Sequence, residues 1–333
     1  MQLSRIAAAM GVLVLAACSD NTAPSPASAP VMASTIAFSK DAAEFPMEIM
    51  HLNPYNGLQN SPLAGASVTG IDYNGGPVLQ VTKVATVYWS TTKIYTGGPT
   101  PGTKGAGSAD GSLVGFFLRN LGGSPYFNIN TTYYDTLGGG AQNPVTNSVT
   151  YTQFWANNAS VPAVTAKVTN TQIRNMLVNG FNTGKLTYDP ATIYSVFTKG
   201  KTNLGGGFGT QYCAYHSKFV WNGKTVIFSA QPYVQAFPNA CSTGTPSPNG
   251  DLAADRVINV LAHEIEESTS DPRLNAWFDP TGQENADKCA WTFGTTYTNG
   301  NGGTANMNMG GKDFLIQQNW VNAGTGGCLQ HFP

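Results

Sequence analysis

The residues best suited to do chemistry crowd one segment of a weakly charged chain. His263, Glu264 and Glu267 form an H-E-x-x-E pattern in a stretch whose apolar residues predict a helix over 251–268. His263 and Glu267 are four positions apart, so in a helix they point off the same face. Glu264 lies about 100° round the helix from His263. The pattern therefore gathers two potential metal ligands and a further carboxylate within little more than one turn.

The same pattern is the H-E-x-x-H arrangement of zinc peptidases with its second histidine replaced by glutamate. In that arrangement the first and last side chains hold the metal, and the adjacent glutamate acts as the base toward the attacking water. A histidine and a glutamate one turn apart are also an ordinary helix-stabilising pair. A metal is favoured because the helix is apolar enough to be buried, and burying several unpaired carboxylates is expensive.

More candidate ligands follow the helix. Asp271 stands just before Pro272, and Glu284 and Asp287 come soon after. We predict a metal site built from His263, Glu267, Asp271, Glu284 and Asp287, with Glu264 as the catalytic base. One histidine with several carboxylates suits Zn²⁺, and the hard oxygen ligands also suit Mn²⁺ or Ca²⁺.

A second histidine, His216, follows Cys213-Ala214-Tyr215. We predict a catalytic role for it in polarising a substrate carbonyl. A further metal ligand and a structural histidine are the alternatives. His51 and His331 lie in polar terminal segments and are predicted to be solvated.

The N-terminus predicts export. Residues 1–17 have the form of a lipoprotein signal peptide: Arg5, then an apolar run too short to span a bilayer, then Leu15-Ala16-Ala17-Cys18. Cys18 would carry the lipid, and residues 18–45 would form a disordered tether rich in Pro, Ser, Ala and Thr. An ordinary secretory signal is the alternative. The predicted location is the cell envelope, at the outer membrane or cell surface, with the membrane bound through lipid on Cys18.

The composition agrees with a protein outside the cytoplasm. Charged residues make up 11% of the chain, against about 25% in typical globular proteins. The net charge is −1 and the sequence has no run of basic residues, so it lacks the positively charged surface that nucleic-acid binding needs. With Cys18 assigned to lipid, four cysteines remain and allow three disulfide pairings. Cys213–Cys241 and Cys289–Cys328 are favoured because each closes a local loop; a four-thiolate zinc site is the rival, but no C-x-x-C pair supports it.

The remaining pattern predicts one domain, 46–333, of α/β (α+β) class: a mixed sheet flanked by helices, with long loops. Helices are expected at 110–121, 171–181 and 251–268, with Ser108 and Asp110 as possible caps of the first. A surface loop is expected at 97–107. The expected strands are 78–89, 126–134, 148–154, 193–197, 224–233 and 314–320.

Several motifs, taken in order, resemble the plant Exordium, or phosphate-induced protein, family. They are Gly75-Gly76-Pro77-Val78, Tyr88-Trp89, Cys213-Ala214-Tyr215-His216, Asn249-Gly250-Asp251, His263-Glu264-x-x-Glu267-Ser268-x-x-Asp271-Pro272, Asn275-Ala276-Trp277 and Glu284-x-x-Asp287-x-Cys289. The resemblance runs from about residue 73 to Cys328 and implies secretion and the set His263, Glu267, Glu284 and Asp287. The chain differs in its lipobox and in having fewer cysteines near position 213, so a plant growth role is not carried over.

Two functions follow. The first is a lipid-anchored, metal-dependent hydrolase, a zincin-like peptidase acting on a peptide or envelope polymer. The second is a non-catalytic surface or carbohydrate-binding protein, in which the acidic cluster holds a structural metal or an ion-pair network. Its plentiful tyrosine, tryptophan and asparagine suit sugar stacking.

Overall fold

The computed structural model describes residues 46–54, 57–58 and 70–333. The predicted signal peptide, the lipidated Cys18 and the tether over 18–45 lie outside the described residues. None of the helices described here combines the length and the apolar character needed to cross a membrane.

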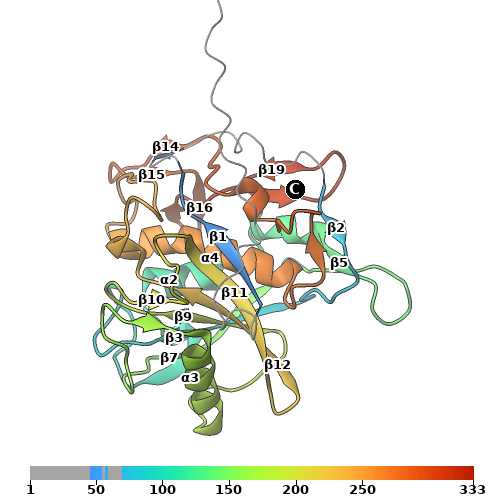
Figure 1. Ribbon diagram of the computed structural model, residues 1–333. Coiled ribbons are helices and arrows are strands. Elements are labelled where there is room, and N and C mark those ends of the chain that lie inside the picture. Colours follow the sequence, from blue (N-terminus) through green and yellow to red (C-terminus); the bar gives the residue numbers. More distant parts are fainter. Residues whose placement is uncertain (1–45, 55–56, 59–69) are drawn as a thin grey trace, which may run out of the picture. The chain divides into compact units, whose positions relative to one another are not determined.

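A seven-stranded mixed sheet forms the centre of the fold, as predicted (Figure 1). Its strands, in spatial order, are β1 (Met47–His51), β11 (Tyr212–Trp221), β12 (Lys224–Gln231), β9 (Thr192–Phe197), β3 (Thr82–Tyr88), β7 (Val149–Trp155) and β4 (Lys104–Ala106). The inner strands β12, β9, β3 and β7 pair in parallel, and the pairs toward both edges are antiparallel. Every residue of β9 is buried, as expected for a strand covered on both faces.

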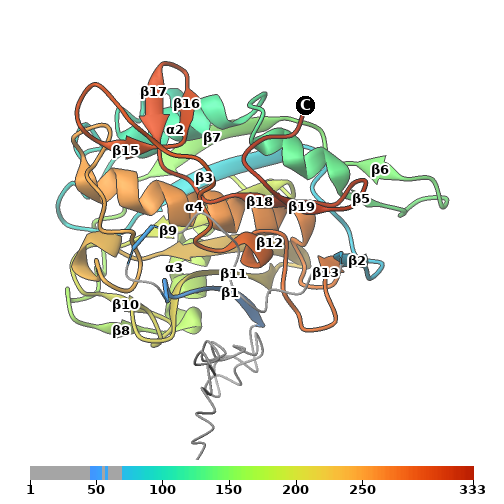
Figure 2. The same ribbon diagram turned by 90° about the horizontal axis from the view of Figure 1, so that it is seen from above.

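Within the described residues, three α-helices cover this sheet: α2 (Leu113–Leu121), α3 (Asn170–Asn182) and α4 (Leu252–Ser270). Figures 1 and 2 show α4 and α2 on one side of the sheet and α3 on the other. All three agree with predicted helices. The cap of α2 differs from the prediction, because the Ser112 side chain accepts the Gly115 N–H at 3.0 Å and starts the helix.

Short ladders and 3₁₀ turns complete the described fold. The ladders pair β2 (Asp72–Tyr73) with β13 (Trp277–Phe278), β5 (Tyr134–Asp135) with β6 (Asn143–Pro144), β8 (Lys167–Val168) with β10 (Asn203–Leu204), β14 (Tyr297–Thr298) with β15 (Thr304–Ala305), β16 (Met307–Met309) with β17 (Lys312–Phe314), and β18 (Asn319–Val321) with β19 (Gly327–Leu329). The turns are η1 (Gly107–Ala109), η2 (Phe127–Thr132), η3 (Val234–Ala236) and η4 (Asp287–Cys289).

The hairpin of β11 and β12 positions the candidate residue His216, which lies on β11. Strand β11 escaped the sequence prediction, although Asn222-Gly223 between the two strands is a strong two-residue hairpin signal. Both turn residues have positive φ, 49° and 74°. Alternation along β11 directs Tyr215 toward the start of α3, where its hydroxyl bonds Asn170, and His216 toward the opposite face, where α4 packs.

Several local predictions are wrong. The segment 126–134 is the 3₁₀ turn η2 rather than a strand, and 314–320 is interrupted between β17 and β18. The predicted loop at 97–107 contains edge strand β4. His51 is not solvated: it ends β1, is only 5% exposed, and its carbonyl accepts the Trp291 Nε1–H at 2.8 Å. The segment around His51 reads as polar, but strand pairing with β11 buries it.

The cysteine prediction is confirmed. Cys213 pairs with Cys241 and Cys289 pairs with Cys328, with Cα–Cα distances of 5.4 and 5.5 Å. Both bridges fit a protein of an oxidising, extracellular environment. Each also fixes a candidate site residue, because Cys213 lies three positions before His216 and Cys289 two positions after Asp287.

Candidate metal centre

Helix α4 carries the H-E-x-x-E pattern into the interior. Asp251 caps the helix by accepting the Ala254 N–H at 3.1 Å, and apolar residues around Val257 and Leu261 are fully buried. The helix packs on β11 and β12, so its inward face meets the His216 face of the sheet. Local capping and burial thus fix the direction in which His263 and Glu267 point.

The first group of side chains joins the end of α4 to the turn η4. His263 Nε2 lies 3.0 Å from Glu267 Oε1 and 3.4 Å from Asp287 Oδ1. The Asp287 backbone N–H donates to Glu267 Oε1 at 3.0 Å, which fixes that carboxylate. One atom from each of these three residues lies within 4.8 Å of the others. The predicted ligands His263, Glu267 and Asp287 therefore meet at one point.

The second group joins the sheet to the same helix. His216 Nε2 on β11 lies 3.3 Å from Glu284 Oε2 and 3.8 Å from Glu267 Oε2. These three atoms also lie within 4.8 Å of one another. Glu267 belongs to both groups, with Oε1 toward His263 and Oε2 toward His216. His216, predicted to act on substrate, therefore lies beside the same carboxylate as His263.

Both groups are buried, and many of their polar side-chain atoms have no hydrogen-bond partner among the described residues. The exposed fraction is 0% for His216, His263, Glu264, Glu267 and Asp271, 1% for Glu284 and 2% for Asp287. The atoms without a hydrogen-bond partner include His216 Nδ1 and Nε2, His263 Nδ1 and Nε2, both oxygens of Glu264 and Asp287, Glu267 Oε2, Asp271 Oδ2 and Glu284 Oε2. The nitrogen–oxygen distances suit ion pairs between the two rings and the carboxylates.

The pKa values of the two histidines are shifted in opposite directions. Burial, together with the charge of His263, lowers the pKa of His216 to about 3, so that ring is neutral. Burial alone would also lower the pKa of His263, but the Glu267 and Asp287 carboxylates hold that pKa well above its usual range. Burial, with the neighbouring Asp287 charge, raises the pKa of Glu267 to about 7. Burial is thus the largest single influence on these pKa values, and perturbed ionisable groups gathered in one place mark a candidate functional site.

Glu264 and Asp271 border the two groups. Burial raises the pKa of Glu264 well above its ordinary value, and its interacting neighbours are His263, Glu267 and Asp287. Asp271 Oδ1 accepts the backbone N–H groups of Asn275 and Ala276 at 2.6 and 2.8 Å, so this oxygen holds the loop after α4. Its Oδ2 remains unpartnered. Asp271 belongs to neither three-residue group, and its clearest role is to shape the loop.

The sequence prediction missed Glu48. This residue on β1 pairs with His216 on β11 in the antiparallel register, so both side chains lie on the same face of the sheet. Its Oε1 is buried and unpartnered, and burial, followed by the charges of Asp287 and Glu267, raises its pKa well above its usual value. A single glutamate in a short terminal strand carries no sequence signal, because only the pairing of β1 with β11 brings it to the centre.

Glu266, on the same helix, is a buried carboxylate with hydrogen-bond donors from neighbouring side chains. Its Oε2 accepts the amide N–H groups of Asn130 at 2.5 Å and Asn319 at 2.6 Å. These neutral donors come from η2 and β18 on another side of α4. Glu264 has no such donor on either oxygen, and Glu267 has one on Oε1 alone, from the Asp287 backbone N–H.

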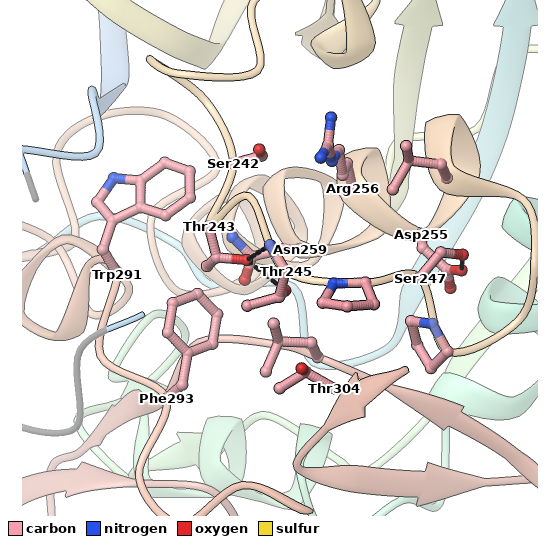
Figure 3. A pocket seen from close by; sticks show the side chains of 14 residues that line it. Ser242, Thr243, Thr245, Ser247, Asp255, Arg256, Asn259, Trp291, Phe293 and Thr304 are labelled. Carbon is pink, nitrogen blue, oxygen red and sulfur yellow. Dashed lines mark hydrogen bonds between the residues drawn. The ribbon is translucent and has the colours of Figure 1, made fainter. Parts of the chain in front are cut away.

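A pocket lies beside the N-terminal half of α4 (Figure 3). Arg256, Asn259, Trp291 and Phe293 line it together with hydroxyl-bearing residues of the loop after Cys241. Asn259 lies one turn before His263 on α4. The acidic and histidine cluster itself does not line this pocket, which contains none of the residues His216, His263, Glu264, Glu267, Asp271, Glu284 and Asp287. Trp291 and Phe293 are each only 1% exposed, so their rings offer no open stacking platform.

The donor set fits a divalent cation. Two ligands of one metal ion lie about 3.0–3.5 Å apart when metal–ligand distances are about 2.0–2.2 Å. The separations of 3.0, 3.3, 3.4 and 3.8 Å are close to that range. Imidazole with carboxylate suits Zn²⁺ or Mn²⁺, and carboxylate-rich sets also suit Ca²⁺. A cation at each point would give a partner to the Nε2 atoms and to the carboxylate oxygens that face them.

Comparison with known proteins links these residues to a family. Residues 124–317 match the model described as the phosphate-induced protein 1 conserved region. Protein EXORDIUM-like 3 of Arabidopsis thaliana is 36% identical over 121 residues, covering 31% of this chain and 35% of the relative. Protein EXORDIUM-like 5 of the same plant is 35% identical over 106 residues, covering 26% and 29%. The chain thus spans about a third of the length of these curated relatives. No solved structure matches.

Proposed function

This chain belongs to the Exordium, or phosphate-induced protein 1, family, and from that premise we propose that it is an extracellular metal-dependent hydrolase. The observation that carries the proposal is the meeting of His263 Nε2, Glu267 Oε1 and Asp287 Oδ1 in a buried place beside Glu264. Two ligands from a helix, one from a following segment and an adjacent free glutamate match the zincin plan.

Each residue has a defined task in this reaction. His263, Glu267 and Asp287 would hold the cation, which when bound supplies Lewis-acid polarisation of a carbonyl. Glu264 would take the proton from the attacking water and pass it to the leaving group. Its two oxygens accept no hydrogen bond, so both are available for a proton. The Asp287 backbone N–H holds Glu267 Oε1 in its orientation.

The proposed substrate is a peptide or an envelope polymer. Export would place the centre outside the cytoplasm, and lipid on Cys18 would keep it close to a membrane. The two disulfides and the family support export.

A second candidate function is a surface protein in which the cation is structural. The observation that favours it is depth: the seven cluster residues on α4, β11 and the loop after α4 are at most 2% exposed. Structural metal sites are closed, whereas catalytic sites keep a position open to substrate. Sugar binding gains no support from the pocket of Figure 3, because its two aromatic rings are buried.

Replacing the base separates the two candidates. Glu264→Gln keeps the shape of the side chain but cannot accept the proton. We expect hydrolysis of a mixed peptide substrate to fall by about 10²-fold or more, with unchanged metal content and circular dichroism. Undiminished hydrolysis by the variant would remove the proposed mechanism. A wild-type protein that binds metal but cleaves no peptide would favour the structural candidate.

A further inference from the structure

His216 is the feature that the proposed reaction leaves unused. The ring is fully buried on β11, and neither nitrogen has a hydrogen-bond partner among the described residues. Its Nε2 faces two carboxylate oxygens, Glu284 Oε2 and Glu267 Oε2, which are also unpartnered. A structural histidine in a protein core normally has a hydrogen-bond partner for its ring nitrogens. A buried imidazole without one, with its Nε2 facing two carboxylate oxygens, is instead arranged as a metal ligand would be.

We infer that His216, Glu267 and Glu284 form a second divalent-cation site, so that the centre is dinuclear with Glu267 bridging. The second site rests on the proposed function in one respect, because it shares Glu267 with the His263 site.

The geometry of Glu267 supports the bridge. Its Oε1 lies 3.0 Å from His263 Nε2, and its Oε2 lies 3.8 Å from His216 Nε2. One carboxylate thus presents a different oxygen to each group. In known two-metal sites the ions lie about 3.5–4 Å apart, a separation that a bridging carboxylate spans.

The charge of the cluster supports two cations rather than one. Six carboxylates interact there: Glu48, Glu264, Glu267, Asp271, Glu284 and Asp287. Lys218 interacts electrostatically with Asp271 of this set, but its ammonium donates to the Arg273 carbonyl. Burying these carboxylates in their charged form is expensive, and a cation at each of the two groups would offset that cost. Glu48 and Asp271 stand beside the second site and supply the additional negative field.

Metal stoichiometry tests the inference directly. The full chain is stripped with chelator, loaded with Zn²⁺ or Mn²⁺, desalted and measured by elemental analysis. We expect two ions per wild-type chain, one in His216→Ala, and two in the matched control His51→Ala, which removes another buried histidine outside both groups. X-ray absorption of the wild type should show metal–metal scattering at about 3.5–4 Å.

Other outcomes are decisive as well. One ion per wild-type chain, or two retained in His216→Ala, would overturn the second site while leaving the first intact. No bound ion would overturn the proposed function and the second site together. If His216→Ala fails to fold, Glu284→Gln provides the same test with an isosteric side chain, and we expect one ion per chain.

Discussion

Glu267 Oε1 and His263 Nε2 lie 3.0 Å apart, one helical turn from each other, as a fully buried pair. The carboxylate of Glu267 helps to hold the pKa of His263 above its usual range. Glu267 Oε1 also accepts the backbone N–H of Asp287, which fixes the orientation of this carboxylate. Glu267 therefore links His263 and Asp287 on one side to His216 on the other, which makes it the central residue of the proposed metal centre.

Neutralising Glu267 should therefore weaken both cation sites. We expect Glu267→Gln to bind Zn²⁺ more than about 100-fold less tightly, because residues that merely orient ligands already account for about 10–100-fold. Isothermal titration of the metal-free protein measures the change. Glu266→Gln is the matched control, since that neighbouring carboxylate contacts Asn130 and Asn319 instead of the cluster. Equal affinities of the two variants would contradict the bridging role.

Each disulfide should support a different site. Removing Cys213–Cys241 by double serine substitution loosens β11 near His216, and removing Cys289–Cys328 loosens the turn that carries Asp287. We expect each change to lower the free energy of unfolding by about 2–5 kcal/mol. Metal titration of each variant should show one weakened site of the two, with the first variant affecting the His216 site. Identical losses at both sites would show that the bridges act only on global stability.

The buried pair Asp279–Lys288 should be a strong determinant of stability. Lys288 Nζ lies 3.2 Å from Asp279 Oδ2, with both side chains fully buried, and 4.8 Å from the Trp320 ring centroid. Asp279→Asn leaves the ammonium unpaired and should destabilise the protein by about 3–5 kcal/mol. The control is Asp189→Asn at the half-exposed Lys83 pair, which should change stability by less than about 1 kcal/mol. Denaturant unfolding at pH 7 compares the two.

The same pair predicts a pH dependence. Burial alone would raise the pKa of Asp279, but hydrogen bonds from Thr281 and Lys288 hold it below its usual value. A lowered folded-state pKa gives stability that is present above the unfolded pKa of about 4 and is lost as pH falls through the folded pKa. The stability gap between wild type and Asp279→Asn should therefore narrow below pH 4. A gap that stays constant to acidic pH would exclude this linkage.

The helix and the disulfides were predictable because their signals are local. Asp251 caps α4, apolar spacing marks its length, and each cysteine pairs with its nearer partner. His216 and Glu48 depend on long-range pairing: β1 joins β11, and β11 faces α4, across more than 150 residues of sequence between the two strands. No local pattern reports such a contact. The sequence therefore named His263, Glu267, Glu284 and Asp287, which the structure brings together, but it overlooked Glu48.

The central claim is that a divalent cation holds this cluster together, and one measurement tests it most directly. The purified full chain is analysed for bound metal, and its thermal melt is recorded before and after chelation. We expect at least one Zn²⁺, Mn²⁺ or Ca²⁺ per chain and a fall in Tm on the order of 5 °C or more after chelation, restored by adding the metal back. A metal-free protein whose melt is unchanged by chelator and by added metal would contradict the account.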